Sequence, residues 1–105
     1  MIFTSSFNRS ARNPKAVAIC RGLQPWYTGR VYDPLRPSWA MLKLKGVEFN
    51  SAYRALLETL DPHKVAADVG DGSVMLCWEH RASKCHRSTV AAWLRAAGYD
   101  VAEVE

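Results

Sequence analysis

The sequence predicts a small α/β domain, in which a mostly parallel sheet is flanked by helices in a Rossmann-like or flavodoxin-like topology. Short apolar runs suited to buried parallel strands alternate with segments whose apolar residues recur at helical spacing. The stretch from Ser73 to Gly98 reads as a strand, a loop and a helix in that order. The length of 105 residues, with 49% hydrophobic content, suits a single domain, residues 1–105, with a modest core.

Two strands are predicted in the first part of the chain. Residues Met1 to Thr4 form a short strand that ends at Ser5-Ser6, and the apolar run from Ala16 to Cys20 forms a second, buried strand. A polar, basic connection joins them. Arg21 directly follows the second strand, and it is expected at the sheet edge where the other parallel strands also end.

The segment from Arg21 to Trp39 contains three of the five prolines, four aromatic residues and interleaved arginines. Its proline content and lack of periodicity predict an ordered loop without regular elements, laid over the sheet edge. Aromatic faces beside arginines suit a nucleobase and its phosphate, and the alternative is that the rings close one end of the core. We expect Trp26, beside Tyr27, to contribute to ligand affinity and Trp39 to contribute to stability.

Helical spacing returns in the second half of the chain. Apolar residues from Phe49 to Leu60 recur at i, i+4, i+7, i+8 and i+11 and predict a helix over 47–60. Asp61 is a favourable N-cap, and Pro62 is a favourable first residue, for a short helix that follows. The other predicted elements are a strand at 74–78, a helix at 88–97 that ends at Gly98, and a last strand at 99–104.

The charge is distributed unevenly along the chain. The net charge is +4, but residues 1–45 contain eight Lys or Arg residues against Asp33 alone, which gives this part a net charge of +7. A basic first half indicates an anionic partner, such as a phosphate, a nucleotide or a nucleic acid, and the alternative is that the charge serves solubility.

The sequence also bears on the compartment and the state of the cysteines. No apolar run approaches the roughly 20 residues needed to span a bilayer, and the first residues lack the layout of a signal peptide, so a cytoplasmic protein without membrane contact is predicted. Three cysteines, Cys20, Cys77 and Cys85, make no disulfide framework, so reduced thiols are expected.

One block resembles a known family. The pattern Leu76-Cys77-Trp78-Glu79, Cys85-His86-Arg87 and Val90-Ala91-Ala92-Trp93-Leu94 with Gly98 is similar to the C-terminal signature of domain of unknown function 488. The similarity extends over nearly the whole chain through Ile2–Phe7, Arg21-Gly22, Pro25–Tyr27, Leu35–Pro37 and Leu56–Pro62. The resemblance implies a small α/β sandwich with a site at the Cys-His-Arg block, and it implies no established activity.

The candidate ligand site lies where the strand at 74–78 ends and the next helix begins. Backbone N–H groups and the helix dipole attract an anion there, and Arg87 adds a guanidinium suited to a phosphate. The alternative is that Arg87 pairs with Glu79 and that a nearby serine is a simple helix cap. The predicted ligand-binding residues are Arg87, His86, Ser88, Thr89, Glu79, Arg21, Ser5, Ser6, Trp26 and Tyr27.

Cys85 is a second possible source of chemistry at this site. A helix start flanked by basic residues lowers the pKa of a thiol and favours a thiolate nucleophile, and the alternative is a small buried residue. A metal site built from Cys77, Cys85 and His86 would need Cys20 or Glu79 as a fourth ligand, and the sequence has no zinc-type pair spacing. Neither a metal nor another cofactor is therefore predicted.

The function predicted from these residues is the binding of a small phosphate-bearing or nucleotide-type ligand. The alternatives are a thiol-dependent enzyme acting on a nucleotide-like substrate through Cys85 and, for a protein of viral or phage origin, ligand sequestration or interaction with a host. Single-stranded nucleic acid is a further possible partner. Sequence-specific duplex binding is not predicted, because the sequence has no helix-turn-helix pattern.

Overall fold

The computed structural model describes residues 1–78 and 86–104, and the structural statements below refer to these residues. Within them, four α-helices and two short 3-10 turns surround five strands. The elements in chain order are β1 (Ile2–Ser6), α1 (Phe7–Ser10), β2 (Ala16–Ala18), β3 (Arg30–Val31), η1 (Asp33–Leu35), η2 (Met41–Lys43), α2 (Val47–Glu58), α3 (Pro62–Val69), β4 (Val74–Cys77), α4 (His86–Ala96) and β5 (Val101–Glu103).

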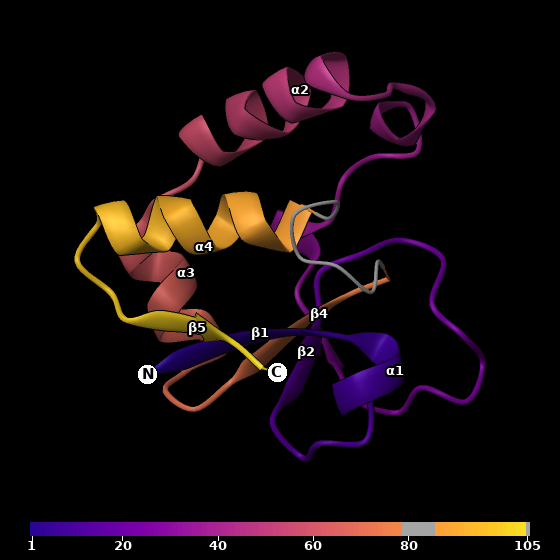
Figure 1. Cartoon of the computed structure of the whole chain (residues 1–105), viewed down its shortest axis with the longest axis vertical. Helices are drawn as coiled ribbons and strands as arrows, with labels where there is room; N and C mark the ends of the chain where they lie inside the picture. The colour runs from indigo at the N-terminus through magenta and orange to yellow at the C-terminus, as the bar shows by residue number, and fades with distance from the viewer. Residues whose placement is uncertain (79–85, 105) are drawn as a thin grey trace.

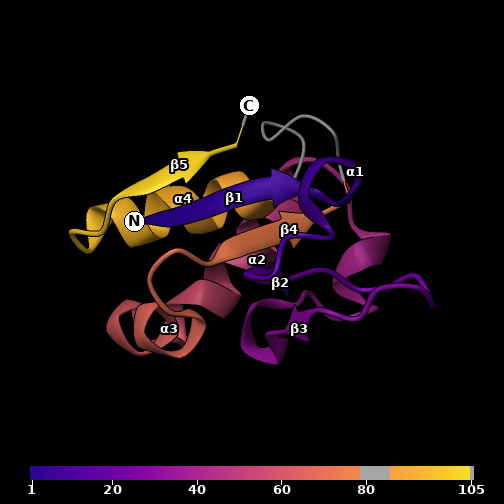
Figure 2. The same cartoon turned by 90° about the horizontal axis from the view of Figure 1, so that it is seen from below.

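The strands form one parallel sheet in the order β3-β2-β4-β1-β5, and Figure 2 shows them side by side. The α/β class and the parallel sheet predicted from the sequence are confirmed. The order is that of a Rossmann-like sheet with β1 and β4 exchanged. After β1 the chain leaves one position in the sheet empty and forms β2 and then β3. It then returns, and β4 fills the position between β1 and β2.

The two faces of the sheet are covered very differently. The helices α2, α3 and α4 lie on one face, and α1 with the connection after β2 lies on the other (Figure 1). The helical face buries the larger core, which contains Ile2, Val17, Ile19, Leu35, Tyr53, Leu57, Val65, Ala66, Val69, Met75, Val90, Ala91, Leu94 and Val101. The α1 face buries only Phe7, Ala16, Ala18, Cys20, Val74 and Leu76, with partly buried residues around them.

Local sequence accounts for most of the helices. In α2 the predicted apolar stripe places Tyr53 and Leu57 in the core. At the start of α3 the side chain of Asp61 accepts a hydrogen bond from the backbone N–H of His63 at 2.9 Å, and Pro62 occupies the first turn, as predicted. Helix α4 begins at His86, two residues before the predicted start. No helix within the described residues is long and apolar enough to cross a membrane.

Strand β1 ends at Ser6, as predicted, but it includes Ser5 and Ser6, and a one-turn helix, α1, follows directly where only a connection was predicted. The prediction for the next segment was wrong. The segment after Arg21 contains β3 and η1, although no regular element was predicted there. Pairing with β2 creates this strand, since the backbone N–H of Tyr32 donates to the carbonyl of Ala18 at 3.0 Å.

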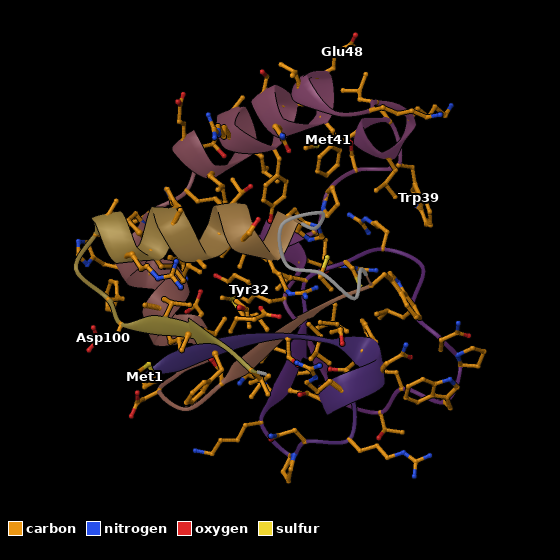
Figure 3. All side chains as sticks on the ribbon, viewed as in Figure 1. Met1, Tyr32, Trp39, Met41, Glu48 and Asp100 are labelled. Atoms are coloured by element: carbon orange, nitrogen blue, oxygen red, sulfur yellow. The ribbon has the colours of Figure 1, made fainter. Side chains whose placement is uncertain are left out.

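Trp39 is not part of the core. Its side chain is 63% exposed and extends outward at the periphery of the molecule, next to the turn that contains Met41 (Figure 3). The expectation that Trp39 contributes to stability through burial was therefore wrong. Tyr32, from the same segment, does pack against the core of the helical face.

The buried hydroxyl of Tyr53 provides a test of the packing between α2 and η1. It donates to the carbonyl of Leu35 at 2.6 Å. Tyr53→Phe should lower the free energy of unfolding by about 1 kcal/mol, because the carbonyl stays buried without this donor. Urea unfolding measures the loss, and Tyr99→Phe, which removes an exposed hydroxyl contact with His63, is the matched control. Equal stability of Tyr53→Phe and the wild type would contradict this packing.

Candidate functional site

The carboxyl ends of β1 and β4 mark the point in the sheet where the chain connections diverge. Ser6 and Cys77 are register partners at these ends. The connection after β1 leaves toward the α1 face, whereas the chain after β4 reaches α4 on the helical face. Ligands of open α/β sheets commonly bind at such a switch point. The side chains that occupy it here therefore decide whether it can accept one.

His86, the first residue of α4, occupies the helical side of this edge. Its Nε2 lies 2.6 Å from the carbonyl of Ile19, and a carbonyl only accepts, so Nε2 carries the proton of the neutral ring. Its Nδ1 lies 3.2 Å from Sγ of Cys77, and the Tyr53 ring packs against the imidazole at a centroid distance of 4.9 Å. Burial lowers the pKa of His86, and the charge of Arg87 lowers it further. His86 therefore acts as a buried, neutral connection between α4 and the strand ends.

Arg87 lies entirely inside the protein, with a side chain that is 0% exposed. Its Nε donates to Oε1 of Glu103 at 3.0 Å and its Nη2 donates to Oε2 at 2.9 Å, a bidentate geometry. Oε1 of Glu103 also accepts from the hydroxyl of Thr4 at 2.6 Å. Arg87 thus joins α4 to β5 and β1, and the structure does not place its guanidinium at a ligand surface.

The remaining predicted residues at this edge divide between structural contacts and other surfaces. The hydroxyls of Ser5 and Ser10 lie 2.7 Å apart and tie α1 to β1. Ser6 is buried and precedes α1 without making a side-chain cap. Ser88 is partly buried, and Thr89 lines a shallow hollow of about 320 Å³ between α2 and α4, away from the strand ends. Glu79 lies outside the described residues.

The two described cysteines differ in state. Cys20 is a free, buried thiol, and burial raises its pKa to about 11, so it is almost fully protonated near neutral pH. Cys77 is disulfide-bonded, which overturns the expectation of reduced thiols for this residue. Cys85 lies outside the described residues, and its role as a nucleophile stays a prediction. No group of His, Cys, Asp or Glu side chains in the described part of the chain could hold a metal ion.

The arginines of the segment from Arg21 to Trp39 hold the backbone in place. Nε of Arg21 donates to the carbonyl of Pro37 at 2.8 Å, so Arg21 fixes the segment across the sheet edge. Arg30 donates to the carbonyls of Val69 and Asp68, at the end of α3. These contacts explain how a segment rich in proline stays ordered.

An aromatic cluster lies on the α1 face, with Phe7 at its centre. The indole of Trp78 stacks on Phe7 at a centroid distance of 4.5 Å and an interplanar angle of 17°. The rings of Tyr27 and Trp26 meet Phe7 edge-on at 5.2 and 6.5 Å. Phe7 is buried, whereas Trp26 is 54% exposed and Trp78 is 37% exposed. The cluster therefore exposes two indole rings to solvent, and both rings contact the buried ring of Phe7.

A hollow of about 410 Å³ adjoins this cluster and is called the α1-face hollow below. The connection between α1 and β2 forms one wall and the residues before β3 form the other. The hydroxyl of Tyr27 donates to the carbonyl of Arg30 at 2.7 Å, and a Cβ at Gly29 would collide with this hydroxyl, so glycine is needed there. The lining residues are Ala11, Arg12, Asn13, Pro14, Trp26, Tyr27, Thr28 and Gly29.

The structure therefore brings together only part of the predicted site. Trp26 and Tyr27 line an open hollow, whereas His86 and Arg87 are buried in contacts within the fold. Sequence reasoning missed Arg12, Asn13, Phe7 and Trp78 as neighbours of the aromatic segment. The basic Arg12-Asn13-Pro14 turn in the connection between the first two strands is a signal for Arg12 and Asn13, whereas no local pattern indicates Phe7 or Trp78.

These features define a small α/β protein with a parallel sheet and an open, basic hollow on its thinly covered face. No protein-family model matches the chain, and no curated protein and no solved structure shows significant similarity to it. The resemblance to domain of unknown function 488 stays a prediction.

The pairing of Arg87 with Glu103 predicts a large effect on stability. Arg87→Ala should lower the free energy of unfolding by about 3 kcal/mol, the lower part of the range for a broken buried pair, since the side chain of Glu103 is 28% exposed. Arg54→Ala, which removes an exposed arginine from α2, is the control and should change stability little. The double variant Arg87→Met with Glu103→Leu should recover part of the loss. Denaturant unfolding that finds Arg87→Ala no less stable than Arg54→Ala would refute this role.

The lowered pKa of His86 predicts a pH dependence of stability. As the pH falls, the unfolded chain binds the proton near the ordinary imidazole pKa of 6.5, whereas folded His86 binds it only at lower pH. The free energy of unfolding should therefore decrease as the pH falls below about 6.5 and level off once folded His86 is protonated. Urea unfolding between pH 7.5 and 5 measures this slope.

His86→Gln should remove most of that slope, and His63→Gln, which changes an exposed histidine on α3, should retain it. A wild-type stability that stays constant or rises over this pH range would contradict the assignment.

Proposed function

We propose that the protein binds a small nucleotide-type ligand in the α1-face hollow, with the ring on Trp26 and the phosphate at Arg12. The observation that carries the proposal is the meeting of an exposed indole and an exposed arginine in one hollow of about 410 Å³. Small-molecule sites typically measure about 300 to 1,000 Å³, so the hollow has the size of such a site.

The position of Trp26 supports a stacking role. The rings of Trp26 and Phe7 meet in a T-shaped arrangement, at an interplanar angle of 83°, and 54% of Trp26 remains exposed. A large apolar side chain that is held in place by a buried neighbour and open to solvent is suited to stack on a flat ring. Tyr27, whose hydroxyl is fixed by the carbonyl of Arg30, provides a rigid wall beside it.

The charges around the hollow support an anionic ligand. Arg12 is exposed and forms no ion pair with any described residue. A guanidinium binds phosphate through paired N–H donors, which makes arginine better suited than lysine to this group. Asp33, the single acidic residue among positions 1–45, is already paired with Arg36 at 2.7 Å. No described acidic side chain lines the hollow.

This location differs from the one expected from the sequence, which centred on Cys85, His86 and Arg87. Burial of His86 and Arg87 favours the α1-face hollow over the start of α4 as the ligand site. The thiol-dependent enzyme depends on Cys85, outside the described residues, and stays a prediction.

Binding of adenosine 5′-monophosphate, uridine 5′-monophosphate and ribose 5-phosphate, measured by isothermal titration calorimetry, tests the proposal. Trp26→Ala should weaken binding of the two nucleotides by about 1 to 3 kcal/mol, roughly fivefold to more than a hundredfold, and leave ribose 5-phosphate unaffected, because only the nucleotides carry a base. Arg12→Ala should weaken all three ligands by about 1.5 kcal/mol or more, because each carries the phosphate.

The matched controls are Trp39→Ala and Arg54→Ala, which remove an exposed indole and an exposed arginine away from the hollow. Both variants should bind as the wild type does. Absence of binding to all three compounds, or equal losses in the hollow variants and the controls, would refute the proposal.

A further inference from the structure

We infer that the natural ligand of this face is single-stranded nucleic acid, of which a free nucleotide fills only one position. This inference rests on the proposed function, since it takes the α1-face hollow as the place of one base. The additional observations are a second exposed indole, Trp78, on the same aromatic cluster and two exposed basic side chains without an ion pair to a described residue, Arg9 on α1 and Arg12 after it.

Trp26 and Trp78 lie close enough to serve neighbouring bases of one strand. Both rings contact Phe7, at centroid distances of 6.5 and 4.5 Å, so the two indoles are at most about 11 Å apart. Successive bases rise about 3.4 Å in a stacked strand, and 11 Å therefore corresponds to about three stacked nucleotides or fewer extended ones. A mononucleotide has one base and leaves the second indole unused.

Trp78 is held as a rigid platform. Its Nε1 donates to the carbonyl of Arg21 at 3.0 Å, while one face of the ring stacks on Phe7. These two contacts fix the indole and still leave the residue 37% exposed. A base that stacks on a ring already fixed in this way orders little of the protein, which reduces the entropic cost of binding.

The charges on this face suit a phosphate backbone. Arg9 on α1 and Arg12 on the connection after it are exposed and form no ion pair with any described residue. Nη1 of Arg9 donates to the carbonyl of Val104 at 2.7 Å, which holds this guanidinium against the sheet. Basic side chains that follow exposed aromatic rings are the usual composition of surfaces that bind single strands without sequence preference. A duplex keeps its bases stacked and paired, so they would not reach the indoles.

The test compares fluorescein-labelled octathymidylate with thymidine 5′-monophosphate and with a labelled duplex of the same length, using fluorescence anisotropy and calorimetry. The single strand should bind at least tenfold more tightly than the mononucleotide and the duplex. The logarithm of its affinity should fall with the logarithm of salt concentration with a slope of about −1.4, which corresponds to two basic contacts, Arg9 and Arg12.

Variants separate the contributions of the ring and the charge. Trp78→Ala should weaken octathymidylate binding by roughly fivefold to more than a hundredfold and lower the ratio of octathymidylate to mononucleotide affinity. Trp78→Leu, which keeps an apolar side chain over Phe7, repeats the test if the alanine variant melts early. Arg9→Ala should reduce the salt slope by about 0.7, whereas Trp39→Ala and Arg54→Ala should leave both affinity and slope unchanged.

The outcomes distinguish the inference from the proposed function. If the mononucleotide binds and the octamer binds no more tightly, or if Trp78→Leu leaves the affinity ratio unchanged, the inference is wrong and the proposed function stands. If the duplex binds as tightly as the single strand, stacking does not contribute and the inference is wrong. If neither thymidine 5′-monophosphate nor octathymidylate binds, both are wrong.

Discussion

The ion pair between Arg87 and Glu103 holds together the elements that define this fold. It connects the first turn of α4 to β5, and the hydroxyl of Thr4 connects the same carboxylate to β1. A buried arginine is tolerated only when it is paired, so the position of α4 over the sheet is set by where Glu103 lies in its strand. The neighbouring His86 extends this connection to the end of β2 through the carbonyl of Ile19.

The polar groups of the helical face make contacts within the fold, and the ligand site proposed above lies on the opposite face. A helix of four residues and the connection after β2 cover the α1 face, and such a thin layer exposes side chains that a longer helix would bury. Phe7 turns this into an ordered surface, because it supports Trp78 and Trp26 from beneath. The two faces therefore differ: the helical face contains the larger hydrophobic core, and the α1 face exposes aromatic and basic side chains.

Local patterns in the sequence were sufficient for helices α2, α3 and α4 and for the central strands. The Asp61-Pro62 cap and the apolar stripe of α2 involve residues within one or two turns, so they are visible without the fold. In contrast, Arg30–Val31 becomes a strand only by pairing with β2. The pairing of Arg87 with Glu103, 16 residues apart, and the central place of Phe7 depend on contacts that no local spacing encodes.

The shortness of β3 has a consequence for solution behaviour. A parallel sheet ends in unpaired backbone groups that can recruit a strand from another molecule. Here that edge is only two residues long, and the guanidinium of Arg30 is turned away to the end of α3, where it donates to two carbonyls. A short edge strand next to a fixed positive charge offers few backbone N–H and C=O groups to a strand of a second molecule. We therefore expect this edge of the sheet to resist edge-to-edge aggregation.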